Sequence, residues 1–482
     1  MKNLAFATIT QLQDLLKNKE ISAQELLTFY LDRFAKYDPA IGAALDVFDK
    51  DSIIAAAAKS GELAGIPGLL KDIIAEKGRS LTCASKILEG YKATYDATST
   101  ARLKDAGAYI VGRANCDEFA MGSSNETSAY KKVKNPWDHE RVAGGSSGGS
   151  IAAVAAGLVP WAIGTDTGSS IRQPAAFCGV VGLKPTYGLV SRYGVTAYAS
   201  SLDCVSVTAR TVKDTAKVLS VIAGKDPKDA TSLATEKKDY AATLDGAIKK
   251  GLKIGVVDAA LHAEGMDPEI VQAIETAIAE LKKLGARIEN VELPAFEYGA
   301  ATYFILSRAE AASNLARFDG VRYGMRAKTD DLFDMYSDTR RDGFGAEVKR
   351  RILIGNYVLS AGHADAFYVN AKKVQQRMRQ EFIETFKKYD LLVLPTTPMP
   401  AFKFGAFDTD RLQMDLQDYF TCPINIAGLP AISMPCGFTK NNLPIGFQIV
   451  GSHLSEELIC QTAHAYEQVT PWHTMHPAQY AE

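Results

Sequence analysis

The pattern of hydrophobic and polar positions predicts alternating helices and strands, beginning with a helix near the N-terminus. Ser22 is followed three residues later by Glu25, which makes a capping box, and apolar residues then recur at helical spacing. We predict that this helix ends at Asp38-Pro39, because the residue before a proline disfavours helical torsions. The alanine-rich residues 51–60 predict a second helix that packs against the first.

The later chain alternates short apolar runs with amphipathic stretches. Strands are predicted for the apolar run that ends at Lys71 and at 109–112, 252–257, 286–293, 390–395, 431–437 and 445–451. Helices are predicted at 96–107 (capped), 268–284, 308–318, 346–388 with a break near Gly362, and 455–468. This rhythm favours a sheet covered by helices. No linker-like stretch and no internal repeat divides the chain, so we expect one domain over residues 1–482.

Composition narrows the class of protein. The chain is 47% hydrophobic and 23% charged, and its 54 Lys and Arg nearly balance its 56 Asp and Glu. A protein that grips nucleic acid by itself normally has a basic excess, so any RNA would be held mainly by a partner. Seven scattered cysteines without a CxxC pair argue for a reducing compartment and against a zinc site. With no signal peptide and no apolar run of membrane-spanning length, we expect a cytoplasmic protein.

Two loops rich in glycine and serine lie between Gly144 and Arg172. They read GGSSGGS and TDTGSSIRQP, and about one helix and one strand separate them. Glycine lets main-chain N–H groups approach a ligand, and a serine hydroxyl can be a nucleophile or a proton carrier. We interpret the pair as a catalytic centre. A flexible linker would not run straight into apolar sequence, and a phosphate-binding loop would need a lysine after its glycines.

Two other hydrolase arrangements compete with this interpretation. Ser146 and Ser147 both satisfy the G-x-S-x-G pattern of a nucleophile elbow, but an elbow follows a strand. The preceding segment NPWDHERVA contains no apolar run of strand length, so we expect no strand there. A Ser-His-Asp triad stays open, because triads are defined in space; the seven histidines have no recognisable relation to either loop.

The segment GGSSGGS, followed by GTDTGSSIRQPAAFCGVVGLKPTYG, resembles the signature of the amidase-signature family of amide hydrolases. Further similarity runs from about Gly65 to Gly451. The resemblance implies an α/β fold, with a single amidase-signature domain built as a large mixed twisted β-sheet between helical layers. It places an N-terminal helical segment at about residues 1–60 and the catalytic core at about residues 65–215.

The same resemblance implies a mechanism without histidine. Ser170 is similar to the nucleophile, Ser146 to a proton-relaying serine on a cis peptide, and Lys71 to the base. The oxyanion pocket would consist of the main-chain N–H groups of Thr167, Gly168, Ser169 and Ser170. A lysine is a base only when neutral, so Lys71 must be buried enough for its pKa to fall from about 10.4. Taken alone, a lysine that ends an apolar strand is most often a surface residue.

The chain departs from the family pattern at two positions near these residues. Ile73 stands where asparagine is usual, and Ser169 stands where most relatives have glycine. The family places the loop at 115–124 beside the substrate. Asp166 and Arg172 flank the second serine loop, and we expect them to brace it.

Other segments, among them FGAEVKRRILIGNY and DYFTCPINIAGLP, resemble the A subunits of aspartyl/glutamyl-tRNA amidotransferases. Such subunits release ammonia from glutamine, misacylated tRNA is activated on a B subunit with ATP and Mg²⁺, and a C subunit clamps the two. The resemblance therefore implies B and C subunits as partners, tRNA bound mainly through the B subunit, and no cofactor bound by this chain. The alternatives are a free-standing amidase for small carboxamides and a catalytically silent scaffold subunit.

Free glutamine carries an α-carboxylate and an α-ammonium, and a selective site offers a countercharge to each. The subfamily resemblance implies Arg350, rather than Arg351, for the carboxylate and Asp418 for the ammonium, with Tyr303 as a further substrate-binding residue. From the residues alone, Arg350 would belong to a solvated helix face and Asp418 would cap a turn.

Overall fold

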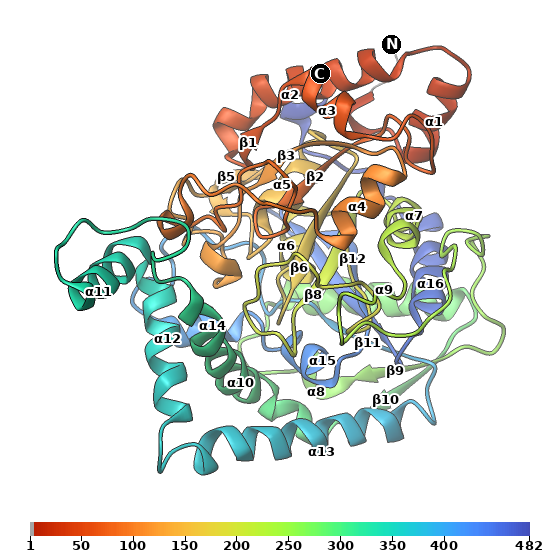
Figure 1. The fold of residues 1–482 in the computed structure, drawn as a ribbon. Coiled ribbons are helices and arrows are strands. Elements are labelled where there is room, and N and C mark those ends of the chain that lie inside the picture. Colours follow the sequence, from red (N-terminus) through yellow and green to blue (C-terminus); the bar gives the residue numbers. More distant parts are fainter. Residues whose placement is uncertain (1–3) are drawn as a thin grey trace.

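A mixed sheet of eleven strands forms the centre of the structure, a computed structural model that describes residues 4–482 (Figure 1). The strands follow the order β1-β3-β2-β6-β8-β7-β12-β13-β11-β9-β10, and β4 and β5 make a separate pair. Their bounds are β1 (Ala44–Val47), β2 (Pro67–Lys71), β3 (Tyr109–Ala114), β4 (Lys134–Asn135), β5 (Asp138–Val142), β6 (Trp161–Asp166), β7 (Val181–Lys184), β8 (Cys204–Ala209), β9 (Lys253–Val257), β10 (Arg287–Val291), β11 (Leu391–Pro395), β12 (Ala431–Phe438) and β13 (Pro444–Gly451).

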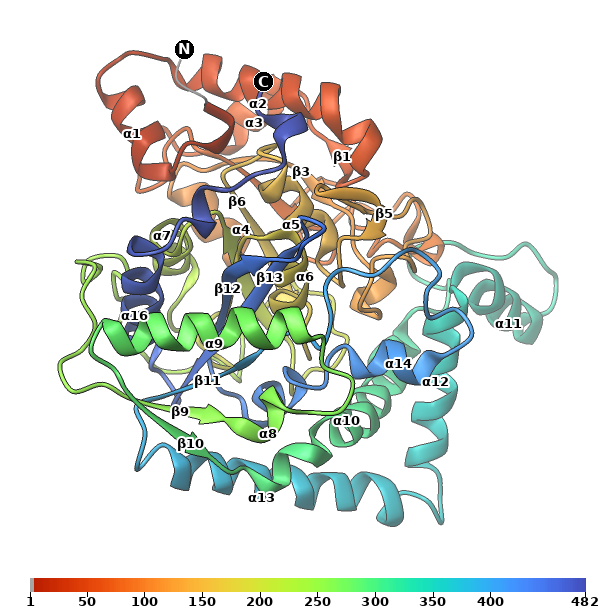
Figure 2. The ribbon, with the colours of Figure 1, turned by 180° about the vertical axis from the view of Figure 1, so that it is seen from behind.

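Helices cover both faces of this sheet, which confirms the predicted α/β layering. Their bounds are α1 (Ile9–Lys17), α2 (Ala23–Ile41), α3 (Lys50–Ala56), α4 (Thr98–Asp105), α5 (Gly148–Ala155), α6 (Arg172–Cys178), α7 (Val212–Ile222), α8 (Asp258–Leu261), α9 (Pro268–Lys283), α10 (Gly299–Asn314), α11 (Leu332–Gly343), α12 (Ala346–Leu359), α13 (Asn370–Thr385), α14 (Arg411–Leu416), α15 (Cys422–Ala427) and α16 (Glu456–Gln468). Helices α9 and α16 pack on β12 and β13 from the side seen in Figure 2, and α5 and α6 lie on the other side. Helices α10, α12 and α13 form an outer layer (Figure 1).

The central strands are buried on both faces. Every residue of β2, β6 and β8 is buried. Strands of this kind read as continuous apolar runs rather than as alternating ones, since both faces contact protein. A polar side chain at the end of such a strand therefore lies inside the molecule, and this is the position of Lys71.

The predicted start of the first long helix is confirmed, but its predicted end is wrong. The Ser22 hydroxyl accepts from the main-chain N–H of Glu25, and the Glu25 carboxylate accepts from that of Ser22. Helix α2 continues through Pro39 and ends at Ile41, with Gly42 as its C-cap, whose φ of 78° is left-handed. The Asp38 carboxylate accepts from the main-chain N–H of Ala43 (2.6 Å), which holds the turn beyond the proline.

Two other helix boundaries, one helix cap and one strand differ from prediction. The second helix, α3, ends at Ala56, because Ala57 is extended. Helix α4 has no side-chain cap at its N-terminus, so the cap predicted there is wrong. Helix α10 begins at Gly299, nine residues before the predicted start at 308. The N-terminal segment, whose first three residues lie outside the described part, also contributes β1 to the sheet edge beside β3.

The predicted break near Gly362 is confirmed, because α12 ends at Leu359 and α13 begins at Asn370. The predicted strands at 252–257, 390–395, 431–437 and 445–451 correspond to β9, β11, β12 and β13. Within residues 4–482, the helices are all too short or too polar to cross a bilayer.

Candidate active site

Lys71 is the last residue of β2 and is 0% exposed. Its strand is flanked by β3 and β6, and the preceding Leu70 pairs with Arg113 on one side and Ile163 on the other. The interpretation of Lys71 as a surface residue, which the residues alone favoured, is therefore wrong. Its ammonium group lies in the interior, beneath both serine loops.

Three hydroxyl groups surround the Nζ atom of Lys71. They are Ser146 Oγ at 2.7 Å, Ser147 Oγ at 2.9 Å and Thr165 Oγ1 at 3.0 Å. Burial lowers the pKa of Lys71 to about 8. At pH 7 that pKa leaves about one tenth of the lysine neutral, far more than an ordinary lysine would have. The site can therefore supply a neutral amine near physiological pH.

The first serine loop connects β5 to α5. The peptide bond between Gly145 and Ser146 is cis, and Ser146 is 0% exposed. The expectation that no strand precedes this loop is wrong, because β5 ends at Val142; it is a polar strand that pairs with β4 outside the main sheet. The Ser146 hydroxyl nevertheless contacts Lys71. In a nucleophile elbow the serine contacts a histidine instead, so this arrangement differs from an elbow.

Ser147 and Thr165 are the two polar contacts of Lys71 that sequence analysis missed. The Ser147 hydroxyl donates to the Thr165 carbonyl (3.0 Å) and accepts from the Thr165 N–H (3.2 Å). The side chain of Ser147 thus ties the first serine loop to the end of β6. The second serine of GGSSGGS and the first threonine of GTDTGSS are present in the sequence, but neither spacing nor composition indicates that both contact one lysine.

The second serine loop runs from the end of β6 to α6 and carries four main-chain N–H groups free of protein acceptors. Within the described residues, the N–H groups of Thr167, Gly168, Ser169 and Ser170 donate no hydrogen bond. All four residues are buried, and Ser170 is 6% exposed. Main-chain N–H groups that are buried and without an acceptor in this way suit an oxyanion. The two serine loops meet through the Ser147 N–H, which donates to the Ser170 carbonyl (3.1 Å).

Asp166 and Arg172 brace the second loop from beneath. Arg172 Nε lies 3.0 Å from Asp166 Oδ2, and both side chains are fully buried. Arg172 also donates to Gln448 Oε1 (2.9 Å) and to the Gly168 carbonyl (3.2 Å). The Arg172 guanidinium holds the pKa of Asp166 below its usual range in spite of burial. Both charges are satisfied by each other and by fixed polar groups.

Histidine takes no part in this arrangement within the described residues. His139 contacts the Tyr480 hydroxyl, and His464 contacts Glu467, both outside the serine loops. Lys71, by contrast, meets Ser146 directly. In the same part of the chain, residues 4–482, His, Cys, Asp and Glu side chains form no group of three or more suited to a metal ion.

Comparison with known proteins identifies the family. A family model described as Amidase matches residues 25–460. The chain belongs to this family. A protein from Picosynechococcus sp., named as the A subunit of glutamyl-tRNA(Gln) amidotransferase, is 50% identical over 483 residues, covering 98% of this chain and 99% of the relative. A protein of the same name from Microcystis aeruginosa is 51% identical over 481 residues, with the same two coverages.

Solved amidase structures share the fold. The crystal structure of the A subunit of glutamyl-tRNA(Gln) amidotransferase from Thermotoga maritima is 40% identical, with a TM-score of 0.84 that covers 99% of this chain and 98% of that one. The structure of 6-aminohexanoate cyclic dimer hydrolase complexed with substrate is 28% identical, with a TM-score of 0.87 and coverages of 99% and 100%. The mixed sheet between helices is therefore an amidase-signature fold.

In this amidase, Tyr303 of α10 covers the second serine loop. A Cβ atom placed on Gly168 would lie 2.6 Å from Tyr303 Cζ, so the tyrosine ring rests directly on that glycine. The departure at Ser169 introduces no left-handed φ, so the serine adopts the loop conformation without strain. Its hydroxyl is buried and makes no hydrogen bond within the described residues.

Asp418 is a buried carboxylate with one oxygen unused. Its Oδ2 atom accepts from the Ser123 hydroxyl (2.7 Å), whereas its Oδ1 atom makes no hydrogen bond within residues 4–482. Burial raises the pKa of Asp418 to about 7, although the nearby Ser123 and Ser169 hydroxyls oppose that rise. A buried carboxylate is costly unless donors reach it; the nearby Ser169 hydroxyl is one donor, and an ammonium group would be a stronger one. The interpretation of Asp418 as a turn cap is wrong, because its carboxylate accepts from the Ser123 hydroxyl, 295 positions away, and within the described residues from no main-chain N–H of its own turn.

The two candidate arginines lie on α12 and share one carboxylate. Arg350 donates two hydrogen bonds to Glu347 (2.8 and 2.7 Å), and Arg351 donates one (2.7 Å). Arg351 is the more buried, with its side chain 8% exposed against 34% for Arg350, and it also donates to the Tyr198 hydroxyl. Both arginines line a cavity of about 150 Å³ together with Ser123, whose hydroxyl contacts Asp418.

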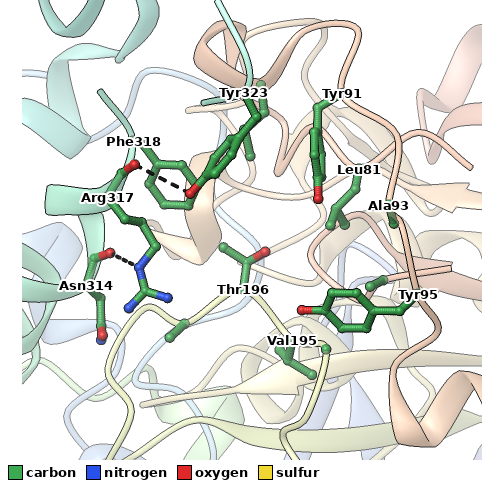
Figure 3. A pocket seen from close by; sticks show the side chains of 14 residues that line it. Leu81, Tyr91, Ala93, Tyr95, Val195, Thr196, Asn314, Arg317, Phe318 and Tyr323 are labelled. Atoms are coloured by element: carbon green, nitrogen blue, oxygen red, sulfur yellow. Dashed lines mark hydrogen bonds between the residues drawn. The ribbon is translucent and has the colours of Figure 1, made fainter. Parts of the chain in front are cut away.

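A separate cavity of about 150 Å³ lies apart from this site (Figure 3). Aromatic rings line it, among them Tyr91, Tyr95 and Tyr323, and Arg317 stands at one side. Neither serine loop contributes a residue to its lining. This cavity is therefore separate from the candidate active site.

Proposed function

We propose that this amidase is the glutamine-hydrolysing, ammonia-supplying A subunit of a tRNA-dependent amidotransferase. The observation that carries the chemistry is the contact between Lys71 and Ser146 (2.7 Å) beneath the four free N–H groups of the second serine loop. The relatives named as A subunits of glutamyl-tRNA(Gln) amidotransferase, which match nearly the whole chain at about half identity, support the biological assignment.

In this proposal Ser170 attacks the side-chain carboxamide carbon of glutamine. Ser146 takes the Ser170 proton and passes its own to neutral Lys71, and the N–H groups of the second loop stabilise the oxyanion. Each such donor contributes about 3 kcal/mol in the transition state. The proton returns along the same path to the leaving nitrogen, and ammonia departs from the acyl-enzyme. Water then attacks the ester, with its proton taken by the same relay, and glutamate is released.

The substrate-binding part of the proposal rests on charge. Glutamine would place its α-ammonium on the free oxygen of Asp418 and its α-carboxylate on Arg350, with Tyr303 against its side chain. Asp418 lies next to the cavity that the arginines line. The Ser123 hydroxyl contacts Asp418, and Ser123 lines that cavity together with Arg350 and Arg351. A carboxylate and a guanidinium so placed select a free amino acid over a simple amide.

The partners in this proposal are a B and a C subunit. The B subunit would bind ATP, Mg²⁺ and the misacylated tRNA, which is Glu-tRNA(Gln), Asp-tRNA(Asn) or both. The near balance of 54 basic and 56 acidic residues supports a division of labour in which this chain does not hold the RNA. In this proposal the complex is located in the cytoplasm.

The test purifies the native chain with its bound partners and compares the complex with the isolated chain. We expect B-like and C-like subunits in the complex, and glutamine hydrolysis that rises when aminoacyl-tRNA and ATP are added. Full, unstimulated hydrolysis by the isolated chain would instead indicate a free-standing amidase for small carboxamides.

A further inference from the structure

A continuous set of hydrogen bonds connects Asp418 with the first serine loop. The Ser123 hydroxyl donates to Asp418 Oδ2 (2.7 Å), and the Ser123 carbonyl accepts from Gln173 Nε2 (2.7 Å). The other end of the same amide, Gln173 Oε1, accepts from the Gly145 N–H (3.0 Å). Gly145 is bonded covalently to Ser146, whose hydroxyl meets Lys71. Two side chains thus span the distance from the buried carboxylate to the proton relay.

The members of this chain have little freedom to rearrange. Gln173 is 0% exposed and Ser123 is 7% exposed. A Cβ atom on Gly144 would lie 2.5 Å from Gln173 Oε1, so the glutamine amide lies close against the loop. Because a buried amide uses both its donor and its acceptor here, a shift at either end costs a hydrogen bond that water cannot replace.

We propose that Ser123 and Gln173 are positioning residues that hold the Gly145–Ser146 segment at a fixed place relative to Asp418. The proposal rests on the proposed function, in which Asp418 receives the α-ammonium of glutamine. Gln173 fixes the position of the first serine loop through the Gly145 N–H, and Ser123 connects Gln173 to the Asp418 carboxylate. A glutamine seated on Asp418 is thereby aligned with the relay that will activate Ser170.

The arrangement has a kinetic consequence. If Gln173 only filled space, an apolar side chain of similar length would serve as well. If it positions Ser146, its loss lowers the rate of the chemical step for any reagent that needs an activated Ser170. Ser123→Ala removes the hydroxyl that contacts Asp418 but keeps the main-chain carbonyl to which Gln173 donates. This change should therefore affect mainly the reactions that use Asp418.

The test uses the whole complex with three single variants, Ser123→Ala, Gln173→Met and Gln375→Met, and the double variants of Ser123→Ala with each methionine change. Gln375 is the matched control: it is 2% exposed and donates to the Ile426 carbonyl, in α15 rather than in a serine loop. The measurements are kcat and KM for glutamine, the rate at which an uncharged sulfonyl fluoride labels Ser170, and the melting temperature.

We expect Gln173→Met to slow both glutamine turnover and sulfonylation by about tenfold or more, and Ser123→Ala to affect glutamine kcat/KM more than sulfonylation. The two changes should be non-additive on glutamine kcat/KM, whereas Ser123→Ala and Gln375→Met should be additive within about twofold. Additivity of the first pair, or equal effects of Gln173→Met and Gln375→Met on sulfonylation, would overturn the proposal. If the wild-type complex did not hydrolyse glutamine, the proposed function would fail, while the sulfonylation comparison would still test the role of Gln173.

Discussion

The Nζ atom of Lys71 lies 2.7 Å from the Oγ atom of Ser146, with both residues 0% exposed. The two residues are 75 positions apart in the chain; Lys71 ends β2, and Ser146 lies in the loop between β5 and α5. Burial removes water from the lysine, and the three hydroxyls offer it hydrogen bonds without a countercharge. This combination keeps a proton acceptor available near neutral pH.

Lys71→Arg should be as inactive in glutamine hydrolysis as Lys71→Ala, with losses of several orders of magnitude. Arginine keeps its proton at any usable pH, so it cannot be the base. Steady-state glutaminase assays on both variants check this, with circular dichroism to establish folding. Substantial activity in the arginine variant would refute a lysine base and restore a histidine mechanism.

The pH dependence of glutamine hydrolysis should follow the titration of Lys71. Its pKa is lowered to about 8, and the neutral form is the active base, so kcat should rise with pH and level off above about 8. The kcat/KM for glutamine also includes the ionisation of Asp418, whose pKa is about 7 in the free protein. Because burial lowers the pKa in the folded state, the unfolded chain binds more protons between that value and the ordinary lysine pKa, and this residue's contribution to stability rises with pH there. A profile flat from pH 6 to 9 would contradict the assignment.

Ser170→Ala should lower the rate of glutamine hydrolysis by several orders of magnitude while the protein stays folded, as expected for the loss of a nucleophile. Ser150→Ala is the matched control. Ser150 is another buried serine, on α5, whose hydroxyl donates to the Ile163 carbonyl rather than contacting Lys71. Mass spectrometry should detect an acyl-enzyme on Ser170 in the wild type. More than trace hydrolysis in Ser170→Ala would show that another residue attacks the amide.

Arg350→Ala and Asp418→Ala should each raise the KM for glutamine steeply, while Ser170 still reacts with a small uncharged amide or an acylating probe. Each removes one countercharge to the amino acid but leaves the relay intact. Lys349→Ala, a neighbour on α12, is the control, and Arg351→Ala tells which arginine faces the substrate. Loss of both reactions together would indicate a structural role, and unchanged glutamine kinetics would show that other charges bind it.

Gly168→Ala should lower kcat/KM for glutamine by about tenfold or more. The added methyl group would lie 2.6 Å from Tyr303 Cζ, so either the ring or the loop has to move. The combined variant Gly168→Ala/Tyr303→Ala removes the clash, and partial recovery of the reaction with an uncharged acylating probe would show that the ring was the obstacle. No recovery would place the damage in the loop itself.

Local signals in the sequence were sufficient for much of the architecture. The Ser22–Glu25 capping box, the run that ends at Lys71 and the break near Gly362 are each decided by neighbouring residues, and each prediction is confirmed. The end of α2 was not predictable in this way, because Pro39 is tolerated where Asp38 and Gly42 complete the last turn. Polar β5 likewise forms where β4 on one side and residues 402–404 on the other are available to pair with it.

What the sequence by itself determined is the fold class and the presence of two serine loops with a lysine at a strand end, because these depend on periodicity and on motifs of adjacent residues. Only the tertiary structure decided which hydroxyls meet that lysine, that Arg350 and Arg351 share Glu347, and that Gln173 joins Ser123 to Gly145. Apart from the two arginine contacts within α12, these contacts join segments far apart in the chain. Their geometry follows from how strands order themselves in the sheet and from burial, which no local pattern encodes.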